Sequence, residues 1–429
     1  MRGATRRLIR RPVSISHYAR ASQQGSTTQT EMKILIAHNS YQQAGGEDAV
    51  VKAEARLLED NGNTVVRYER SSNELRDNGV LASMMAATGA VWSSSSYHSF
   101  ASILRETRPD IAHFHNTFPL ISPSAYFACT ENRVPVVQTL HNYRLICPGG
   151  QLLRKGQICE NCVRKDVRWP GVVYGCYRGS SALTATTAAM LAVHAALGTW
   201  KRKVSLYVAL SEFARAKFIE GGLPPERLTV KPHFVPSAVK DGNRAGDSVL
   251  FVGRVSPEKG PQLLPVAWSH LKARIPLHIL GDGPLRADIA AKVASMQQSP
   301  IFVHGYCSTE QVVSFMESAR CLVVPSLCYE TFGLSVVEAF SCGLPVIAAR
   351  IGSLAEIVHD GMTGLHFEPG NAEDLAAKVE WAWEHPKEIS QMGRNARAEF
   401  EAKYKPQKNY KMLMEIYARA MAISAEEWP

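Results

Sequence analysis

The sequence PSLCYETFGLSVVEA, Pro325–Ala339, decides the fold because it joins a strand to a helix through a polar loop. The apolar run Cys321–Pro325, at whose end it begins, has the length and composition of a buried strand. Gly343 fits the C-terminus of the helix, and Pro345 prevents the helix from continuing into the next apolar strand. A strand, a loop, a helix and a second strand predict a parallel sheet whose helix N-terminus can bind an anion.

The same alternation of strands and helices extends over most of the 429 residues. Because 45% of them are hydrophobic, a chain of this length predicts two domains rather than a single core. We therefore predict an α/β protein with two Rossmann-like domains, whose mainly parallel sheets face each other across a cleft. The predicted parts are a basic tail or over-extended start (1–31), an N-terminal domain (32–236), a C-terminal domain (237–405) and a final helix (406–429), with a polar linker at 240–247.

The net charge of +9 gives little reason to expect a nucleic-acid partner. Residues 1–30 contain six arginines and no acidic residue, which leaves +3 for the remainder, and no basic stripe alternates with aromatic residues. The tail has the composition of an organellar transit peptide, but a disordered tail, or a true start at Met32, is the preferred interpretation.

The uncharged stretch Gly179–Trp200 comes nearest to a membrane-spanning helix. Its many alanines and its Ser, Thr and His residues favour a packed helix instead, one that could touch a membrane surface. We expect a cytoplasmic protein, and peripheral contact with the inner face of the cytoplasmic membrane is a further hypothesis.

Four of the nine cysteines cluster in one loop-rich segment: Cys147, Cys159, Cys162 and Cys176. The pair Cys159 and Cys162 has the spacing of zinc ligands, but the outer two lack a second such spacing. The cluster is therefore either a structural zinc site or a set of free or disulfide-bonded thiols.

In the first half, glycine or polar residues follow three expected strands, at positions that line the ligand crevice of a parallel sheet. These residues are Gly45, Gly46, His115, Asn116, His141 and Asn142. A glycine pair also suits any tight turn, and a lone histidine is more often structural than functional. Two strands that each end in His-Asn favour a polar floor of an active site.

In the second half, Arg254 and Lys259 lie on a loop after an expected strand, with a glycine on either side. Two fixed cations suit a diphosphate, although the loop alone could equally carry solvated surface charge. The helix that follows Phe332 and Gly333 offers unpaired N–H groups to the same phosphates. Its Glu338 has apolar neighbours, so we expect it to be partly buried and partnered, or to accept hydrogen bonds from a ribose diol.

These features resemble glycosyltransferase family 4, whose members are retaining enzymes with the GT-B fold. The resemblance extends from about Met32 to the C-terminus, and the ordered set of segments is specific. The segments are Phe251–Arg254, Glu258–Gly260, Gly281–Pro284, Pro325–Ser326, Glu330–Glu338, Gly343–Ala348 and Gly361–Gly364. The family also implies that the last helix crosses back to the first domain.

The resemblance implies a role for each matching residue. Arg254 and Lys259 bind the donor diphosphate, together with the helix start at Phe332, Gly333 and Leu334. Glu338 binds the ribose, and Glu330 contacts hydroxyls of the donor sugar. His141 lies beside the reacting sugar and, with Arg254, Lys259 and Glu330, forms the catalytic set. Gly45 and Gly46 contact the phosphates from the other domain, and Gly281 and Tyr306 frame the base.

The implied activity is hexosyl transfer with retention, from a UDP- or GDP-sugar to a hydroxyl of a glycan or lipid-linked glycan. It requires no metal and would serve polysaccharide or glycolipid assembly. One departure is His233-Phe234, where many members have Asn-Gly after the proline. The alternatives are an epimerase of nucleotide sugars with the same fold and a protein that binds sugar nucleotides without catalysis.

Overall fold

The computed structural model describes residues 31–40, 45–75, 89–236, 246–296 and 300–428. Most of the predicted tail and most of the predicted linker lie outside this part of the chain. The described residues form two six-stranded sheets and one two-stranded hairpin. The predicted α/β class, with two mainly parallel sheets, is confirmed.

The first sheet has the strand order β2-β1-β3-β4-β7-β8. Its strands are β1 (Lys33–Ser40), β2 (Thr64–Ser71), β3 (Ile111–Asn116), β4 (Val136–Thr139), β7 (Leu206–Ala209) and β8 (Leu228–Val230). The pairs β1–β2, β1–β3, β3–β4 and β7–β8 are parallel. The strand order reverses between β1 and β3, which is the position where open α/β sheets bind ligands.

The second sheet has the order β11-β10-β9-β12-β13-β14, and all its neighbouring strands are parallel. Its strands are β9 (Val249–Val252), β10 (Leu277–Leu280), β11 (Ile301–Gly305), β12 (Cys321–Val324), β13 (Val346–Ala349) and β14 (Gly364–Phe367). This is the strand order of a dinucleotide-binding Rossmann sheet, and its reversal falls between β9 and β12.

The described chain divides into two compact units by internal contacts. The first unit comprises residues 1–138, 203–205 and 420–429, and the second comprises 139–202 and 206–419. Each unit is described by itself below.

The first unit contains the helices α1 (Gly46–Asp60), α3 (Ser94–Thr107) and α4 (Ser124–Glu131). Aromatic side chains pack α3 and α4 against strand β3. Phe100 of α3 stacks on Phe114 of β3 with ring centroids 5.2 Å apart, and Tyr126 of α4 meets Phe114 edge-on at 4.8 Å. Such contacts add to the stabilisation that burial of the rings already provides.

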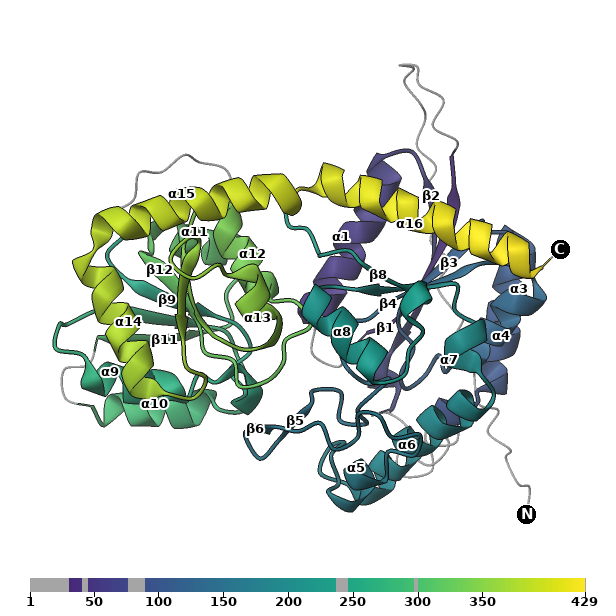
Figure 1. Ribbon diagram of the computed structural model, residues 1–429, viewed down its shortest axis with the longest axis horizontal. Helices are drawn as coiled ribbons and strands as arrows, with labels where there is room; N and C mark the ends of the chain where they lie inside the picture. The colour runs from purple at the N-terminus through teal and green to yellow at the C-terminus, as the bar shows by residue number, and fades with distance from the viewer. Residues whose placement is uncertain (1–30, 41–44, 76–88, 237–245, 297–299, 429) are drawn as a thin grey trace, which may run out of the picture. The chain divides into compact units, whose positions relative to one another are not determined.

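Side chains of the second sheet alternate between its two faces, as the period of a strand requires. Val249 and Phe251 face one apolar cluster, with helices α9, α10 and α14, whereas Leu250 faces a second cluster, with α11, α12 and α13. Both faces are therefore covered, and the strands can be apolar throughout (Figure 1). These helices are α9 (Leu263–His270), α10 (Arg286–Ala294), α11 (Thr309–Ser318), α12 (Leu334–Ser341), α13 (Gly352–Ile357) and α14 (Ala372–Glu384).

The last two helices are α15 (Pro386–Lys403), which contributes to both clusters, and α16 (Pro406–Glu427). Within the second unit, Asn409 of α16 accepts a hydrogen bond from Lys231 Nζ at 2.9 Å and donates to the Pro232 carbonyl. Lys231 is completely buried, so this pairing satisfies an ammonium group that would otherwise be costly to bury.

The segment 139–202 contains little sheet. It holds the hairpin β5 (Leu153–Arg154) and β6 (Gln157–Ile158), followed by α5 (Trp169–Val173), α6 (Ser181–Ala196) and α7 (Thr199–Arg202). The single helix predicted for Gly179–Trp200 is wrong, because Gly198 adopts a left-handed φ of 67° and separates α6 from α7. Helix α8 (Glu212–Glu220) follows β7, and Ser211 caps its N-terminus. No helix in the described residues has the length and hydrophobicity needed to span a bilayer.

Candidate active site

The predicted donor site lies where the strand order of the second sheet reverses. Lys259 lies on the loop after β9, and Glu330 lies on the loop after β12. The Lys259 ammonium is 2.6 Å from Glu330 Oε1 and 2.8 Å from Oε2. Two loops that are separated by 71 residues in the sequence therefore bring opposite charges together after the carboxyl ends of β9 and β12, where open α/β sheets bind ligands.

Gly260 fixes the approach of these two loops. It adopts a left-handed φ of 71°, and a Cβ atom at this position would lie 1.9 Å from the carbonyl oxygen of Pro325. Leu327 N also donates to the Glu258 carbonyl at 2.9 Å. The loop after β9 can therefore lie directly on the loop after β12 only with glycine at 260.

Both predicted diphosphate-binding cations have carboxylate partners. Arg254 donates to Glu258 Oε1, and Glu258 also accepts a hydrogen bond from Ser256 Oγ at 2.7 Å. Glu330 pairs with Lys259 as described above, so the two cations are balanced by two carboxylates. The positions of the two cations were predicted from the sequence. Their pairing with carboxylates was not predicted, because it depends on how the loops fold.

Both members of the Lys259–Glu330 pair are charged at neutral pH. Burial by itself would raise the pKa of Glu330, but the ammonium of Lys259 and the hydroxyl of Ser326 lower it overall. Burial likewise opposes the charge of Lys259, and the Glu330 carboxylate raises its pKa in spite of this.

Helix α12 begins directly after the loop that carries Glu330. Its N-cap, Gly333, has a left-handed φ of 117°, and a Cβ atom there would lie 2.9 Å from Leu354 Cδ2. Leu334 is the first residue of the helix, so its unpaired N–H groups follow directly after the loop that carries Glu330. The predicted strand, loop and helix around Pro325–Ala339 are thus present.

Glu338 of α12 is partly buried, as predicted, but the predicted protein partner is missing. Among the described residues, its carboxylate makes no hydrogen bond and no ion pair. Burial raises its pKa to about 7. A partly buried carboxylate without a protein partner is suited to accepting hydrogen bonds from a ligand.

The loop after β12, which carries Glu330, Thr331 and Phe332, is called the donor loop below. His141 is joined to this loop through its backbone and through its ring. Its carbonyl oxygen accepts a hydrogen bond from Thr331 Oγ1 at 2.9 Å. Its ring stacks on His233 with centroids 5.1 Å apart, and His233 meets Phe332 edge-on at 5.4 Å. The departure at His233 thus has a structural consequence, because an asparagine there could not form this stack.

Several residues that were not predicted also position the donor loop. The carbonyl oxygen of Glu330 accepts hydrogen bonds from Tyr143 Oη at 3.2 Å and from Ser353 Oγ at 2.8 Å. Ser211 Oγ donates to the carbonyl of Thr331 at 3.0 Å. These hydroxyl groups belong to residues that are distant in the sequence, and no local pattern identifies them.

Three glycines, Gly253, Gly281 and Gly305, lie at the carboxyl ends of β9, β10 and β11 in the second sheet. They are called the glycine edge below. Gly281 N donates to the Gly305 carbonyl at 2.7 Å, and a Cβ atom on Gly281 would lie 1.9 Å from the Gly253 carbonyl oxygen. The ends of β9, β10 and β11 therefore lie close together without side chains between them. Tyr306, which follows this edge, has 83% of its surface exposed.

In the first unit, Gly45 is the N-cap of α1, next to Gly46, its first residue. The backbone N–H of Gly45 donates to Asp48 Oδ2 at 2.9 Å, and Asp48 Oδ1 lies 2.8 Å from His38 Nε2. A Cβ atom on Gly45 would meet no atom within 4 Å in the described structure, so backbone close to Gly45 is accessible.

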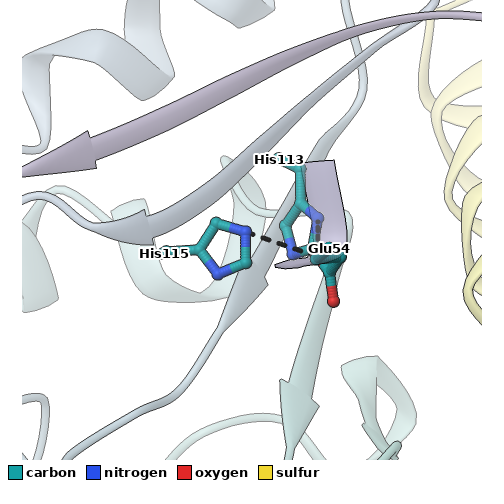
Figure 2. A group of neighbouring side chains, drawn as sticks. All are labelled: Glu54, His113 and His115. Atoms are coloured by element: carbon teal, nitrogen blue, oxygen red, sulfur yellow. Dashed lines mark ion pairs between the residues drawn. The ribbon is translucent and has the colours of Figure 1, made fainter. Parts of the chain in front are cut away.

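A buried carboxylate lies between two histidines in the same unit (Figure 2). Glu54 Oε1 of α1 is 3.2 Å from His113 Nδ1 and 3.4 Å from His115 Nε2, both on β3. All three side chains are buried, and burial, reinforced by His113, lowers the pKa of His115 to about 3. The side chain of His115, which was predicted to contribute to a polar floor of an active site, lies in the protein interior.

Sequence profiles of two families match the chain. The profile described as Glycosyltransferase Family 4 matches residues 44–238, and the one described as Glycosyl transferases group 1 matches residues 240–399. An uncharacterized glycosyltransferase of Methanocaldococcus jannaschii is 42% identical over 130 residues, which cover 30% of this chain and 36% of that protein. A D-inositol 3-phosphate glycosyltransferase of an Arthrobacter species is 34% identical over 184 residues, which cover 40% of this chain and 44% of that protein. The chain thus spans less than half the length of these two curated relatives.

The fold is also similar to solved structures. Anabaena HepE, in its complex with UDP-glucose, aligns with a TM-score of 0.65 and 17% identity over 90% of this chain and 100% of that chain. At this identity the likeness concerns the fold, and it agrees with the predicted GT-B architecture of two Rossmann-like sheets. The two profile matches together extend over most of the chain, which belongs to glycosyltransferase family 4.

Proposed function

We propose that this protein is a retaining glycosyltransferase that transfers a sugar from a nucleoside diphosphate sugar to a hydroxyl group. The observation that carries the proposal is the Lys259–Glu330 pair at the crevice of the second sheet, next to the N-terminus of α12. Anabaena HepE, which has a similar fold, was solved with UDP-glucose, and this supports a nucleotide-sugar donor here.

In the proposed complex, Arg254, Lys259 and the N-terminus of α12 bind the diphosphate. Each cation then exchanges its carboxylate partner, Glu258 or Glu330, for phosphate oxygens. The released Glu330 carboxylate is free to accept hydrogen bonds from hydroxyls of the donor sugar. The positive end of the helix dipole adds to the stabilisation of the anion.

The nucleoside is placed between Glu338 and the glycine edge. The partly buried Glu338 carboxylate accepts two hydrogen bonds from the ribose diol, which satisfies a charge that the described protein groups do not satisfy. The edge formed by Gly253, Gly281 and Gly305 lets a flat base approach the backbone, and the exposed ring of Tyr306 can cover it.

The main catalytic requirement is stabilisation of the departing diphosphate. The bond between the anomeric carbon and the β-phosphate oxygen breaks, and a bond from the acceptor oxygen to the same carbon forms on the same face. The hydroxyl proton moves to the departing phosphate oxygen. Fixed cations and a helix N-terminus stabilise the charge that develops on the leaving group without reorganising during the reaction. His141, held by Thr331 and stacked on His233, orients the reacting sugar.

The acceptor in this proposal is a lipid-linked glycan, met at a membrane surface. Six large apolar side chains between residues 167 and 197 are exposed: Val167, Trp169, Val173, Tyr174, Val193 and Leu197. Cationic groups lie among them, with the Arg154 guanidinium 4.0 Å above the Tyr174 ring and Lys165 6.0 Å from the Trp169 ring. Exposed apolar groups with basic neighbours suit binding at the surface of anionic lipid.

The proposal is tested by incubating the full chain with a panel of UDP- and GDP-sugars, with and without lipid-linked glycan acceptors. We expect one donor to raise the melting temperature, because a ligand that binds only the folded state stabilises it. We also expect nucleoside diphosphate to be released only when the acceptor is present. Isomerisation of the donor without an acceptor would identify an epimerase instead, and binding without turnover would identify a non-catalytic protein.

Vesicle flotation tests the membrane surface. Wild-type protein should float with vesicles that contain anionic phospholipid. The double substitution Trp169→Ser/Val173→Ser should weaken vesicle binding by at least about tenfold, since full burial of one apolar side chain alone contributes about 1.5–3 kcal/mol. A matched control, Phe302→Ser, removes an exposed apolar side chain from the second sheet and should bind as wild type does. Equal binding by all three proteins would contradict the membrane hypothesis.

A further inference from the structure

The four clustered cysteines surround one small cavity. Cys147, Cys159, Cys162 and Cys176 all line a cavity of about 10 Å³, together with prolines and other neighbouring residues. This volume accommodates one small ion or one water molecule. Gly171 closes one side, and a Cβ atom there would lie 3.4 Å from Cys162 Sγ. Four cysteines spread over 30 positions of the sequence thus line one cavity.

The local backbone places the Cys159–Cys162 pair directly after a hairpin. The β5–β6 hairpin turns at Gly156, whose φ is 75°, and leads directly into Cys159. Cys159 N donates to the Leu152 carbonyl at 2.8 Å, which fixes the start of the two-residue spacing to Cys162. A hairpin followed by this spacing is typical of sites where two thiolates share one metal ion.

The thiols are chemically available. All nine cysteines belong to the described residues, and none of them forms a disulfide. Four crowded thiolates repel each other, and a divalent cation at their centre removes this repulsion.

We propose that Cys147, Cys159, Cys162 and Cys176 bind one structural zinc ion. Four sulfur ligands and no open position favour zinc in a closed tetrahedral site rather than a catalytic metal. In such a site each sulfur would lie about 2.3 Å from the ion. This site is independent of the proposed sugar transfer.

The zinc site also supports the donor loop from within the same unit. Cys147 N donates to the Tyr143 carbonyl at 2.8 Å, and Tyr143 Oη donates to the carbonyl of Glu330. Glu160, between Cys159 and Cys162, lies 2.6 Å from Lys217 Nζ and hydrogen-bonds to Tyr329, next to Glu330. This loop-rich segment, whose only sheet in the described residues is the β5–β6 hairpin, would therefore be stabilised by metal on the side that contacts the donor loop.

Metal analysis of the purified full chain tests the proposal. We expect about one zinc ion per chain for the wild type and less than about a tenth of this for Cys159→Ser/Cys162→Ser, because removal of two of four ligands leaves an incomplete site. The matched control Cys307→Ser changes a partly buried thiol outside the cluster and should retain the zinc. Replacement of zinc by cobalt in the wild type should give the absorption bands of tetrahedral thiolate coordination.

The cobalt spectrum keeps the test valid if the double variant does not fold. Absence of thiolate-to-cobalt bands in folded wild-type protein would overturn the proposal. Retention of zinc by the folded double variant, or a disulfide between any two of the four cysteines in protein purified without oxygen, would overturn it as well. Each of these readouts is independent of whether the protein transfers a sugar.

Discussion

The two parallel sheets differ in what they place at the reversal of strand order. Near the first reversal, Glu54 lies between His113 and His115, and all three side chains are carried by a helix and a strand and are sealed from solvent. At the second reversal, Lys259 and Glu330 lie on loops, and 31% of the lysine side chain is exposed. The same topological position thus holds a closed polar cluster in one sheet and an accessible ion pair in the other.

This difference teaches that the strand order alone does not identify a ligand site. Charged residues on regular elements are fixed within the interior, whereas loops at the ends of strands present their charges to ligands. The expected effects of substitution should differ accordingly: the accessible pair should affect turnover, and the closed cluster should affect stability.

The substitution Lys259→Ala should have the largest effect. It tests whether the accessible ion pair of the second sheet is needed for turnover. Removing one preorganised cation from the diphosphate should lower kcat by about 10²- to 10³-fold, measured as acceptor-dependent release of nucleoside diphosphate. The control Lys292→Ala removes an exposed lysine of α10 in the same unit and should leave kcat unchanged. Wild-type turnover by Lys259→Ala would end the proposed assignment.

The substitution Glu338→Gln should raise the KM for the donor by about tenfold, because an amide accepts hydrogen bonds from a diol less well than a carboxylate. Steady-state kinetics at varied donor concentration measures this effect. Glu384→Gln, at an exposed position of α14, is the control. An unchanged KM would show that Glu338 does not contact the donor.

The pH dependence of stability provides a second readout for Glu338. Since burial raises its pKa to about 7, the folded protein keeps this proton over a range in which the unfolded chain releases it. Stability is therefore lost as the pH rises from about 4.5 to about 7. We expect Glu338→Gln to be more stable than the wild type by about 1–2 kcal/mol at pH 8 and equally stable at pH 4, allowing for partial solvent screening. Urea denaturation at the two pH values measures the difference, and a constant difference would contradict it.

The substitution Glu54→Gln tests the closed cluster. Loss of the carboxylate from between two histidines should lower the free energy of unfolding by about 1–3 kcal/mol, with kcat of the folded protein within about twofold of the wild type. Glu59→Gln changes an exposed ion pair on the same helix and should shift stability by less than about 1 kcal/mol. If Glu54→Gln abolished turnover without loss of stability, the distinction between the two regions would fail.

The smallest effect is expected for Gly45→Ala. The structure has space for the added methyl group, and the φ of −127° at this position suits alanine. The variant should therefore fold normally, and a methyl group near the predicted phosphate contact should raise the donor KM by no more than about threefold. A fall in stability would instead show that Gly45 is needed for the turn alone.

The sequence was sufficient to predict elements whose signals are local. The apolar run before Pro325 predicted a strand, the residues around Gly333 predicted the start of a helix, and the structure contains both. The break at Gly198 was missed because the stretch around it is uniformly rich in alanine, and a single glycine within a helix is often tolerated.

The candidate site was predictable in its charged residues but not in their partners. Arg254, Lys259 and Glu330 are marked by their positions after strands, whereas the hydroxyls of Tyr143 and Ser353 reach the donor loop only after folding. Side-chain pairs separated by many residues depend on tertiary packing, which periodicity and spacing in one sequence do not encode. The cavity shared by the four cysteines also depends on tertiary packing, because their spacing alone left both a structural metal and free or disulfide-bonded thiols as alternatives.

The carboxylates beside Arg254 and Lys259 act as counterions that belong to the protein. In the proposed reaction, a donor enters by displacing Glu258 and Glu330 instead of neutralising bare cations, so little exchange of dissolved ions accompanies binding. When the nucleoside diphosphate leaves, the same carboxylates return to the cations and lower the free energy of the released state. Donor affinity should therefore depend only weakly on salt concentration, and product inhibition should be modest.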